Sequence, residues 1–520
     1  VTAYTYDRLG RVLTETRASG TAEAVTTSFE YDAFGQVVRT TDARGNSSYS
    51  YYDQAGRTVR TVDAENYLTV TEYTAFGEVQ SVTRRYNKVS GTPVVGTLPA
   101  LPASHTLDAT TSFTYDRLGR VLQATDATQT NYEAYTYNAF GNVLTHRNKL
   151  GGITSYQYDA LGRRTQETLP AAAYNTSGTV AASAIVNRFE YDSRGNMTRK
   201  IEAYGISGQT RTTNYTYDAA DRLRYVSGDA VQILPGQEES NNDLYTVTPT
   251  EEMRYDRRGN VIERIDANGF RTQTWYDKLG RVTHQLVQQT GTHGTLTRNT
   301  YDASGNVTET RVFETLVTMQ ANATGTPPAG SGNARAVTFE YDRLNRMIWS
   351  RTQAVWTADF TSGATIMQSV LATHYLYDAM GNVIRVTDPN GGQVHSYYDK
   401  LGRKEREVDQ GRYLTHWEYN AQGNVTRERR YAQPVTGTVS TTSYGTFTNN
   451  YPLSTPAEAL AQTYQDRVTD YTYDRMGRKL TETRQGVLVF NGSNGFAVQN
   501  AVVSFTYNAL GQVATKTEAA

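Results

Sequence analysis

Alternating polar and nonpolar positions recur along the whole chain and predict β-strands throughout. In Ser112–Asp126 (SFTYDRLGRVLQATD), Phe113 and Tyr115 lie two residues apart, so both point to one face of an extended strand. The polar segment Asp116–Gly119 follows, and Arg120–Leu122 is again rich in strand-forming residues. This pattern predicts a β-hairpin with a short polar turn.

The predicted turn has a specific chemistry. Asp116 occupies the first position and Gly119 the fourth, as in a type I β-turn. The aspartate carboxylate accepts a hydrogen bond from the backbone two residues on, and the glycine supplies the positive φ that follows. Such a turn also fixes the register of the two strands that it joins.

This hairpin unit is repeated along the chain. The octapeptide YDRLGRVL occurs unchanged at Tyr6–Leu13 and Tyr115–Leu122. Imperfect copies of its Y-D-x-x-G core begin at eighteen tyrosines: Tyr6, Tyr31, Tyr52, Tyr73, Tyr115, Tyr137, Tyr158, Tyr191, Tyr217, Tyr255, Tyr276, Tyr301, Tyr341, Tyr377, Tyr398, Tyr419, Tyr473 and Tyr507. A repeat of this length indicates an array of supersecondary units rather than separate globular domains.

The spacing of the units predicts how they connect. Tyr31, Tyr52 and Tyr73 are 21 residues apart, which two strands of about seven residues and two turns fill. A second turn, as in Asp42–Asn46 and Asp266–Gly269, lies between consecutive units. We therefore expect a continuous antiparallel meander of roughly 36 strands. Because open sheets wider than about 10 strands curl or close, this ribbon must coil. The predicted fold is all-β, a spiral ribbon that forms a shell or a tube.

The residue after the turn glycine alternates strictly between two types. It is arginine at 11, 57, 120, 163, 222, 281, 346, 403 and 478, and Gln36, Glu78, Asn142, Asn196, Asn260, Asn306, Asn382, Asn424 or Gln512 in the units between. Neighbouring hairpins therefore have different environments. Our hypothesis is that each guanidinium lies over a neighbouring tyrosine ring or pairs with a hairpin aspartate.

Insertions follow a rhythm of four units and never enter the Y-D-x-x-G turn. We expect long loops on the opposite rim at 84–112, 225–250, 312–337 and 429–470, with a short helix from Thr455–Glu458 onward. These loops are either contact surfaces or tolerated decoration, and the second interpretation is favoured. We expect residues 1–520 to be one array of eighteen units, incomplete at both ends and part of a longer protein.

Composition narrows the function classes. The chain has 39 Tyr against 14 Phe and a formal net charge of −1, so no overall positive field attracts nucleic acid. Its mean hydropathy is −0.60, which suits a thin sheet with solvated faces. Cysteine is absent, which excludes disulfides and thiolate metal sites within this sequence. No apolar run is long enough for a membrane span, and no signal peptide stands at Val1.

No catalytic or ligand constellation is apparent. The seven histidines are scattered, and even His284 and His293 lack the spacing of a metal site. Asp388–Gly392 resembles a calcium-loop fragment but aligns with the other rim turns and is interpreted as a turn. The repeated tyrosines and arginines favour a structural ladder over a ligand site. We predict no enzyme, no cofactor, no metal and no catalytic residues.

Units such as YDRLGRVLTET, YDAFGQVVRTTDARGN and YTYNAFGNVLTHRN resemble the YD repeats of the Rhs family, which are shared by Tc toxin B and C components and teneurins. The resemblance spans Ala3 to Thr517. It implies a β-sheet ribbon that spirals into a hollow shell, which encloses a C-terminal toxin in bacterial members and supports adhesion in teneurins. The family's shell-closing segment with a D-P-x-G-L core is matched only superficially by Val386–Gly392 (VTDPNGG), so no protease activity is implied for any residue.

Two functions therefore remain open. The first is a wall segment of a secreted or cell-surface bacterial container, whose partner is an effector polypeptide enclosed from the same or a partner chain. The alternative is an extracellular adhesion or filament scaffold that binds a cell-surface glycan or protein through its rim loops.

Overall fold

The computed structural model describes residues 1–176, 179–233, 245–321, 323–353, 355–359, 365–435, 439, 466–490 and 496–518. Within these residues every regular element is a β-strand. A single antiparallel sheet holds 37 of the strands, and 36 of them pair in chain order, each with the strand before and after it. The predicted all-β antiparallel meander is confirmed.

The 36 strands of the ribbon follow one another in the order of the chain. The first fourteen are β1 (Ala3–Tyr6), β2 (Val12–Arg17), β3 (Val25–Tyr31), β4 (Val37–Thr41), β5 (Ser47–Tyr52), β6 (Thr58–Val62), β7 (Tyr67–Tyr73), β8 (Val79–Lys88), β9 (Ala109–Tyr115), β10 (Val121–Thr125), β11 (Tyr132–Tyr137), β12 (Val143–Arg147), β13 (Ile153–Tyr158) and β14 (Arg164–Thr168). The ribbon continues with β17 (Val186–Tyr191), β18 (Met197–Glu202), β19 (Arg211–Tyr217), β20 (Leu223–Ser227), β23 (Thr250–Tyr255), β24 (Val261–Ile265), β25 (Arg271–Tyr276), β26 (Val282–Gln288), β27 (His293–Tyr301) and β28 (Val307–Phe313). It ends with β30 (Ala334–Tyr341), β31 (Met347–Thr352), β34 (Ala372–Tyr377), β35 (Val383–Thr387), β36 (Gln393–Tyr398), β37 (Lys404–Val408), β38 (Tyr413–Tyr419), β39 (Val425–Pro434), β40 (Arg467–Tyr473), β41 (Lys479–Phe490), β42 (Phe496–Tyr507) and β43 (Val513–Glu518).

Each Y-D-x-x-G segment forms the turn of one hairpin, and we call these eighteen turns the tips. In the first tip, the Gly10 amide donates to the Asp7 carbonyl and the Asp7 amide donates to the Arg11 carbonyl. Gly10 has a φ of 78°, as the glycine of a β-bulge requires. Two tips lack this glycine, and there Asp221 and Asn345 adopt the positive φ instead. The turn chemistry predicted from Asp and Gly is therefore the one observed.

The connections between hairpins form the opposite edge of the ribbon, which we call the rim. Strands extend further into the predicted loops than expected, so the long connections among the described residues are 89–108 after β8 and 314–333 after β28. Most of the predicted loop 429–470 lies outside the described residues. The rim also carries small two-stranded sheets, β15–β16 (Ala172–Thr176, Thr179–Ser183), β21–β22 (Val231–Ile233, Tyr245–Val247) and β32–β33 (Val355–Asp359, Thr365–Ser369). Only the second of these lies in a loop that the sequence predicted. The helix expected from Thr455 lies outside the described residues.

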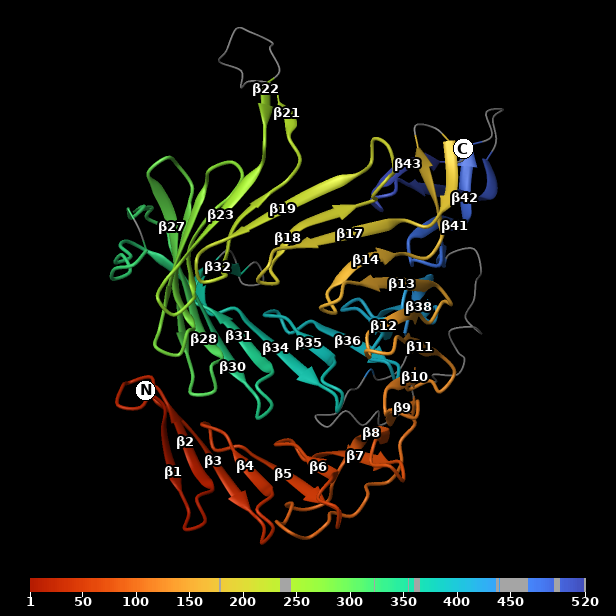
Figure 1. Cartoon of the computed structure of the whole chain (residues 1–520). Coiled ribbons are helices and arrows are strands. Elements are labelled where there is room, and N and C mark those ends of the chain that lie inside the picture. Colours follow the sequence, from red (N-terminus) through yellow and green to blue (C-terminus); the bar gives the residue numbers. More distant parts are fainter. Residues whose placement is uncertain are drawn as a thin grey trace.

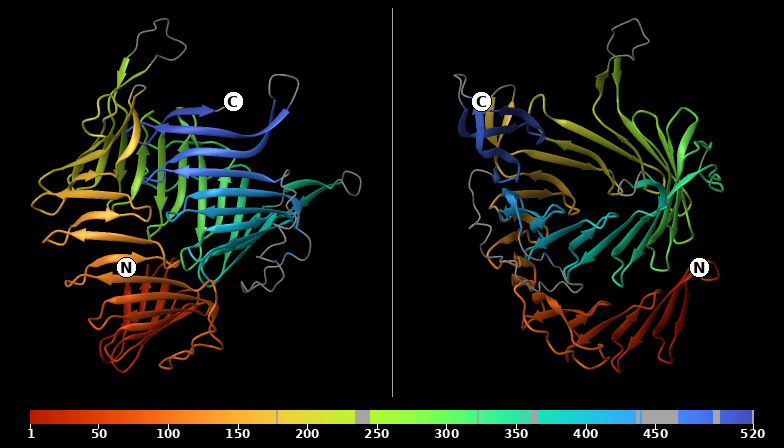
Figure 2. Two further views of the ribbon diagram at one scale, coloured as in Figure 1. Left: turned by 90° about the vertical axis from the view of Figure 1, so that its right-hand side faces the viewer. Right: turned by 180° about the vertical axis from the view of Figure 1, so that it is seen from behind.

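The ribbon coils so that later hairpins stack on earlier ones (Figures 1 and 2). The guanidinium of Arg44 donates to the carbonyls of Tyr341 and Asp342, and that of Arg84 donates to the carbonyl of Ala379. These partners are 297, 298 and 295 residues apart, and this separation is the length of one revolution of the ribbon. We call residues 1–276 the first coil and residues 277–518 the second coil.

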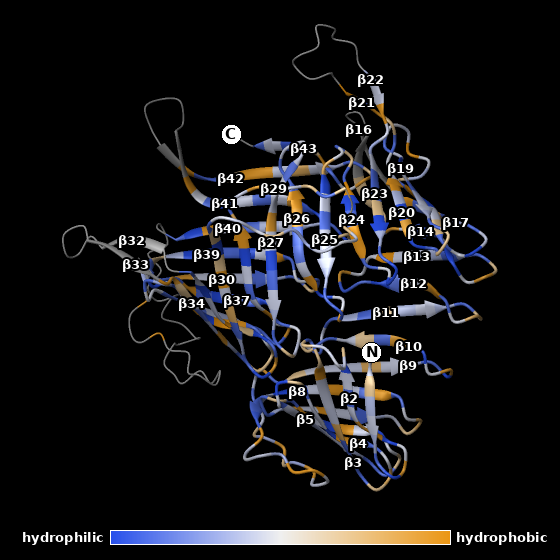
Figure 3. Cartoon of the chain, turned by 90° about the vertical axis from the view of Figure 1, so that its left-hand side faces the viewer, coloured by the Kyte–Doolittle hydropathy of each residue, from blue (hydrophilic) through white to orange (hydrophobic). Residues whose placement is uncertain are grey.

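The buried apolar residues form several small clusters rather than one core, and Figure 3 shows hydrophobic residues scattered in short patches along the strands. Two clusters lie under the long connections. Trp275 packs with Leu286 and with Ala323 of the connection 314–333, and Tyr51 packs with Val89. Figures 1 and 2 place both long connections on the outer side of the curved wall. The connections therefore cover apolar positions of the outer face.

Candidate functional surfaces

A three-residue clasp joins each arginine-bearing hairpin to the next one. In the first clasp, Arg11 Nε donates to Asp7 Oδ2 at 2.7 Å, and its guanidinium carbon lies 4.7 Å from the centre of the Tyr31 ring. Arg11 Nη1 also donates to the carbonyl of Asp32 at 2.9 Å. The arginine therefore pairs with its own tip and covers the tyrosine of the following hairpin.

All nine arginines that follow a tip make this clasp. Each pairs with the aspartate of its own tip. Each also lies over a tyrosine of the next hairpin, namely Tyr31, Tyr73, Tyr137, Tyr191, Tyr255, Tyr301, Tyr377, Tyr419 and Tyr507. The hypothesis from the sequence offered these contacts as alternatives, and the structure shows both at every site.

Several of the intervening hairpins use an amide in place of the guanidinium. Asn196, Asn260, Asn306 and Asn382 each donate from Nδ2 to the second carboxylate oxygen of their tip aspartate. The shorter side chain satisfies the aspartate without covering the next hairpin's ring. Arginine clasps and shorter asparagine–aspartate contacts therefore alternate along this part of the ribbon.

The repeat tyrosines supply a second ladder. The Tyr31 hydroxyl donates to the Val12 carbonyl of the preceding hairpin at 2.7 Å. The same bond forms at every later repeat tyrosine, from Tyr52 to Tyr507. It satisfies a carbonyl at the bulge, where the strand ladder is interrupted. This explains why the array uses tyrosine at a position where phenylalanine fits equally well by size.

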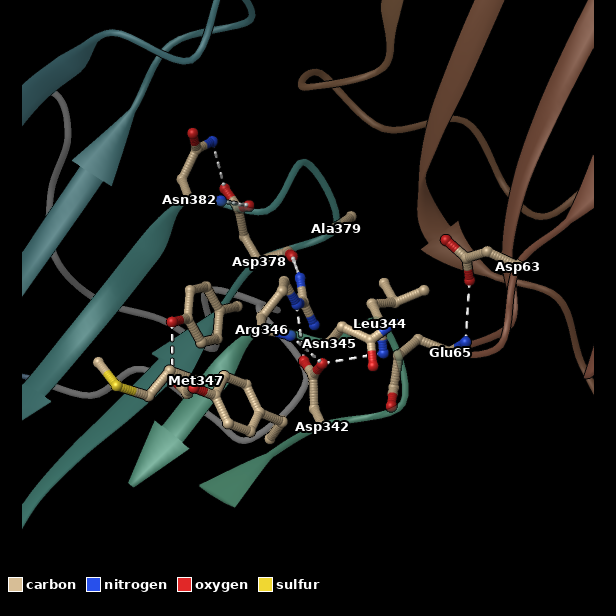
Figure 4. Close-up of polar contacts among 12 residues, drawn as sticks. Asp63, Glu65, Asp342, Leu344, Asn345, Arg346, Met347, Asp378, Ala379 and Asn382 are labelled. Carbon is tan, nitrogen blue, oxygen red and sulfur yellow. Dashed lines mark hydrogen bonds and ion pairs between the residues drawn. The ribbon is translucent and has the colours of Figure 1, made fainter. Parts of the chain in front are cut away.

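The two coils meet along a seam in which tips of the second coil lie on the rim of the first (Figure 4). There Arg346 bridges Asp342 and the Asp378 carbonyl, and both tips face the rim turn that holds Asp63 and Glu65. Further along the seam, Asn148 Nδ2 donates to the Arg475 carbonyl at 3.1 Å. Sequence reasoning missed these contacts because the seam partners are far apart in the chain, and no pattern within the repeat links them.

Apolar residues fill the gaps in the seam. Tyr67 and Tyr86 of the first coil pack against Ala379 and Met380 of the second. Burial raises the pKa of Tyr67 to about 12. A second seam cluster joins Ile185 and Ala203 to Ala509, Met476 and Leu510. The seam therefore has both hydrogen bonds and an apolar interior.

The concave face carries a stripe of aromatic side chains. Tyr51 and Trp275 stand one residue before a repeat tyrosine and pack on the outer face, so residues two before it point to the concave face. Twelve hairpins have an aromatic residue there: Tyr4, Phe29, Phe113, Tyr135, Tyr156, Phe189, Tyr215, Phe339, Tyr375, Trp417, Tyr471 and Phe505. Most are only half-buried. Members from adjacent hairpins are two strands, or about 10 Å, apart.

Basic groups lie within this stripe. The Arg164 guanidinium is 5.6 Å from the Tyr156 ring and 4.8 Å from the Phe189 ring. Lys479 stands in the same way between Tyr471 and Phe505. The concave face thus offers both π-faces and cations, a surface suited to many different side chains.

No group of three or more potential metal ligands occurs among the described residues. The two histidines considered from the sequence face different partners: His284 pairs with Arg298 across the strands, and His293 bonds to Thr292 and Thr318. Asp388–Gly392 is a rim turn closed by the Gly391 amide and the Asp388 carbonyl. No described helix is long and apolar enough to cross a membrane.

Comparison with known families identifies the repeats. Residues 31–67 and 137–174 match the RHS Repeat model, and residues 248–445 match the Teneurin YD-shell model. Residues 31–67, 137–174 and 248–445 are therefore segments of RHS/YD-repeat shell, as the sequence resemblance indicated. The matched segments are structural repeats, and no catalytic domain is identified in them.

One curated relative is double-stranded DNA deaminase toxin A of Burkholderia cenocepacia (strain H111), with 25% identity over 328 residues. The match covers 59% of this chain and 18% of that toxin, so the chain spans less than a fifth of its relative. Among solved structures, the crystal structure of TcdB2-TccC3-Cdc42 is similar at 15% identity and a TM-score of 0.47. The alignment covers 99% of this chain and 28% of the chain in that structure. The Photorhabdus luminescens Tc holotoxin pore with the TccC3-D651A mutation is similar at 14% identity and a TM-score of 0.37. That alignment covers 96% of this chain and 28% of the chain in the pore structure.

Proposed function

We propose that residues 1–520 are part of the wall of a bacterial container that encloses an effector polypeptide supplied by the same or a partner chain. The observation that carries this proposal is the coiled sheet itself (Figure 1), together with the aromatic stripe on its concave face, which is only partly buried. A purely structural fibre has no need of partly exposed aromatic residues facing inward. The proposal also assigns the protein to the secreted or cell-surface fraction and assigns no catalysis to these residues.

The curvature of the wall limits the cargo. Twenty-one strands, β5 to β30 in ribbon order, separate the seam partners Arg44 and Asp342. At about 4.8 Å per strand the perimeter is about 100 Å, which gives a backbone diameter of about 32 Å. Side chains reduce the free width to about 20 Å, because packed sheets need about 10 Å between them. A folded domain of about 100 residues has a radius of gyration of about 13 Å and does not fit. The proposed cargo is therefore extended or unfolded.

The outer loops favour this function over adhesion. The connections 89–108 and 314–333 bury Tyr51 and Trp275 of the wall, so part of each loop stabilises the sheet. Their sequence does not have to serve an external partner.

Protease protection of the intact polypeptide tests the proposal. An enclosed effector segment resists protease until urea unfolds the wall. At that urea concentration the segment is digested in all molecules together. Replacing Phe29 and Phe505, which are only partly buried, by Ser weakens the concave stripe and shortens the protection, whereas Thr114→Ser on the outer face has no effect. An effector segment digested at once in the native protein overturns the proposal.

A further inference from the structure

Six tips of the first coil expose large apolar side chains. They are Leu9, Phe34, Phe76, Leu118, Phe140 and Leu161, with exposed fractions of 77%, 91%, 92%, 74%, 91% and 76%. Each stands directly before the glycine of its tip, so the six form one row along one edge of the sheet. We call this the tip row. It spans seven consecutive hairpins, or about 60 Å. An apolar row of this length is unusual for a surface that remains in water.

The same sequence position is covered in the second coil. Leu344, Met380, Leu401, Met476 and Leu510 stand before the same turn position, and none of them is fully exposed. Met380 packs against Tyr67, Tyr86 and Leu107 of the first coil. One repeat position thus occurs in two environments within one chain, and the difference is whether a rim lies against it.

The covered tips show what chemistry this surface accepts. Their backbone carbonyls accept hydrogen bonds from rim donors, as Ala379 does from Arg84 and Arg475 does from Asn148. The Ala509 amide donates to Gln209 of the rim. The apolar side chains enter the gaps between rim turns. A rim of short Asp or Asn turns that carries Arg, Asn or Gln is therefore complementary to a tip.

We propose that the tip row is the docking seam for a preceding coil of YD-repeat sheet, located N-terminal to residue 1 in the same spiral. Seam partners within this chain are 258 to 327 residues apart, from Arg44 and Asp302 to Asn148 and Arg475, so the rim that covers the tip row belongs to the ribbon one such interval earlier. The curated relative is more than long enough to hold such a coil, because this chain spans only 18% of it. The proposal concerns the assembly of the wall and does not depend on a cargo.

Thiol labelling tests this proposal, because residues 1–520 contain no cysteine. Phe34→Cys and Leu118→Cys report on the tip row in the intact polypeptide, with any cysteine elsewhere replaced. Thr114→Cys, in the same hairpin as Leu118 but exposed on the outer face, gives the unprotected rate. Met380→Cys gives the rate within an established seam. All four variants are also measured in residues 1–520 alone, where slow labelling of the Met380→Cys variant verifies the fold.

The expected result in the intact polypeptide is that Phe34→Cys and Leu118→Cys label at least about tenfold more slowly than Thr114→Cys. In residues 1–520 alone, the three variants are expected to label at the same rate. Equal labelling of all three in the intact polypeptide overturns the proposal. If Phe34→Cys and Leu118→Cys are already protected in residues 1–520 alone, and sedimentation shows association that rises with protein concentration, the tip row binds a second copy of the chain. That result also overturns the proposal.

Discussion

The tips at Asp116 and Asp378 have the same turn geometry and opposite electrostatic environments. Asp116 accepts hydrogen bonds from the Leu118 and Arg120 amides, and Asp378 accepts them from the Met380 and Asn382 amides. The Arg120 amide and guanidinium lower the pKa of Asp116, whereas burial raises the pKa of Asp378. Local sequence therefore determines the turn and the partner of its aspartate, and the coiling of the ribbon determines how deeply that aspartate is buried.

The largest effect is expected where a seam contact leaves no room for a side chain. A Cβ on Gly152 would lie 2.8 Å from the Arg475 carbonyl of the second coil. Gly152→Ala is expected to destabilise the protein by about 2 kcal/mol in urea unfolding. Gly392 ends an equivalent rim turn, but a Cβ there meets only the side chains of Gln410 and Asp388. Gly392→Ala is the control and is expected to cost much less, so equal losses would show that the seam is not formed.

The clasp gives the next effect. Arg346 holds Asp342, the Asp378 carbonyl and the Tyr377 ring at once. Arg346→Met removes these contacts and leaves Asp342 without its counter-ion, at an expected cost of about 2 kcal/mol. Arg343→Met changes an exposed arginine of the same tip and is expected to be neutral. The difference is measured by urea unfolding, and a cost shared by both variants would show that the clasp contributes nothing of its own.

The tip aspartates Asp116 and Asp378 are expected to respond differently to loss of charge. Asp116→Asn loses the ion pair with Arg120 and is expected to lower the urea midpoint at pH 7. Asp378→Asn keeps the acceptor at Oδ1, loses the bond that Oδ2 accepts from Asn382 Nδ2, and removes a charge that burial disfavours, so its midpoint is expected to fall less than that of Asp116→Asn. If Asp378→Asn proves the more harmful variant, water reaches the Asp378 carboxylate and the seam does not bury this tip.

The smallest effect is a pH dependence located in the second coil. His395 lies opposite Arg385, and His416 lies between Arg406 and Arg429, with Glu405 nearby. Burial, and then these arginines, lower the pKa of both histidines from 6.5. Below pH 6.5 the unfolded chain thus binds more protons than the folded chain, and stability falls as the pH drops from 7 toward 5.

Replacing both histidines by Gln is expected to reduce the slope of urea midpoint against pH in that range. His284 and His374, whose pKa values burial also lowers, contribute the remaining slope. His146→Gln, in the first coil and opposite Tyr135 and Thr154 rather than arginine, is the control. An unchanged slope in the double variant would place the acid sensitivity elsewhere in the chain.

Much of this architecture follows from local sequence. The Asp and Gly of each tip, the order of the strands and the arginine clasp all involve residues within one or two hairpins, so the repeat alone predicts them. The seam was not predictable, because Arg44 and Asp342 are 298 residues apart and no periodicity links them. The number of residues per coil also depends on how twist accumulates over about 21 strands, which the repeat does not encode. The rim sheets β15–β16 and β32–β33 were missed because their short segments do not share the repeat.

Single-particle imaging of the intact polypeptide is the decisive test of a coiled wall that encloses a cargo. We expect a spiral wall in which seam partners lie 258 to 327 residues apart, with weakly ordered density against the aromatic stripe of its concave face. A narrow tube whose interior is filled by its own side chains would contradict both the coil and the container.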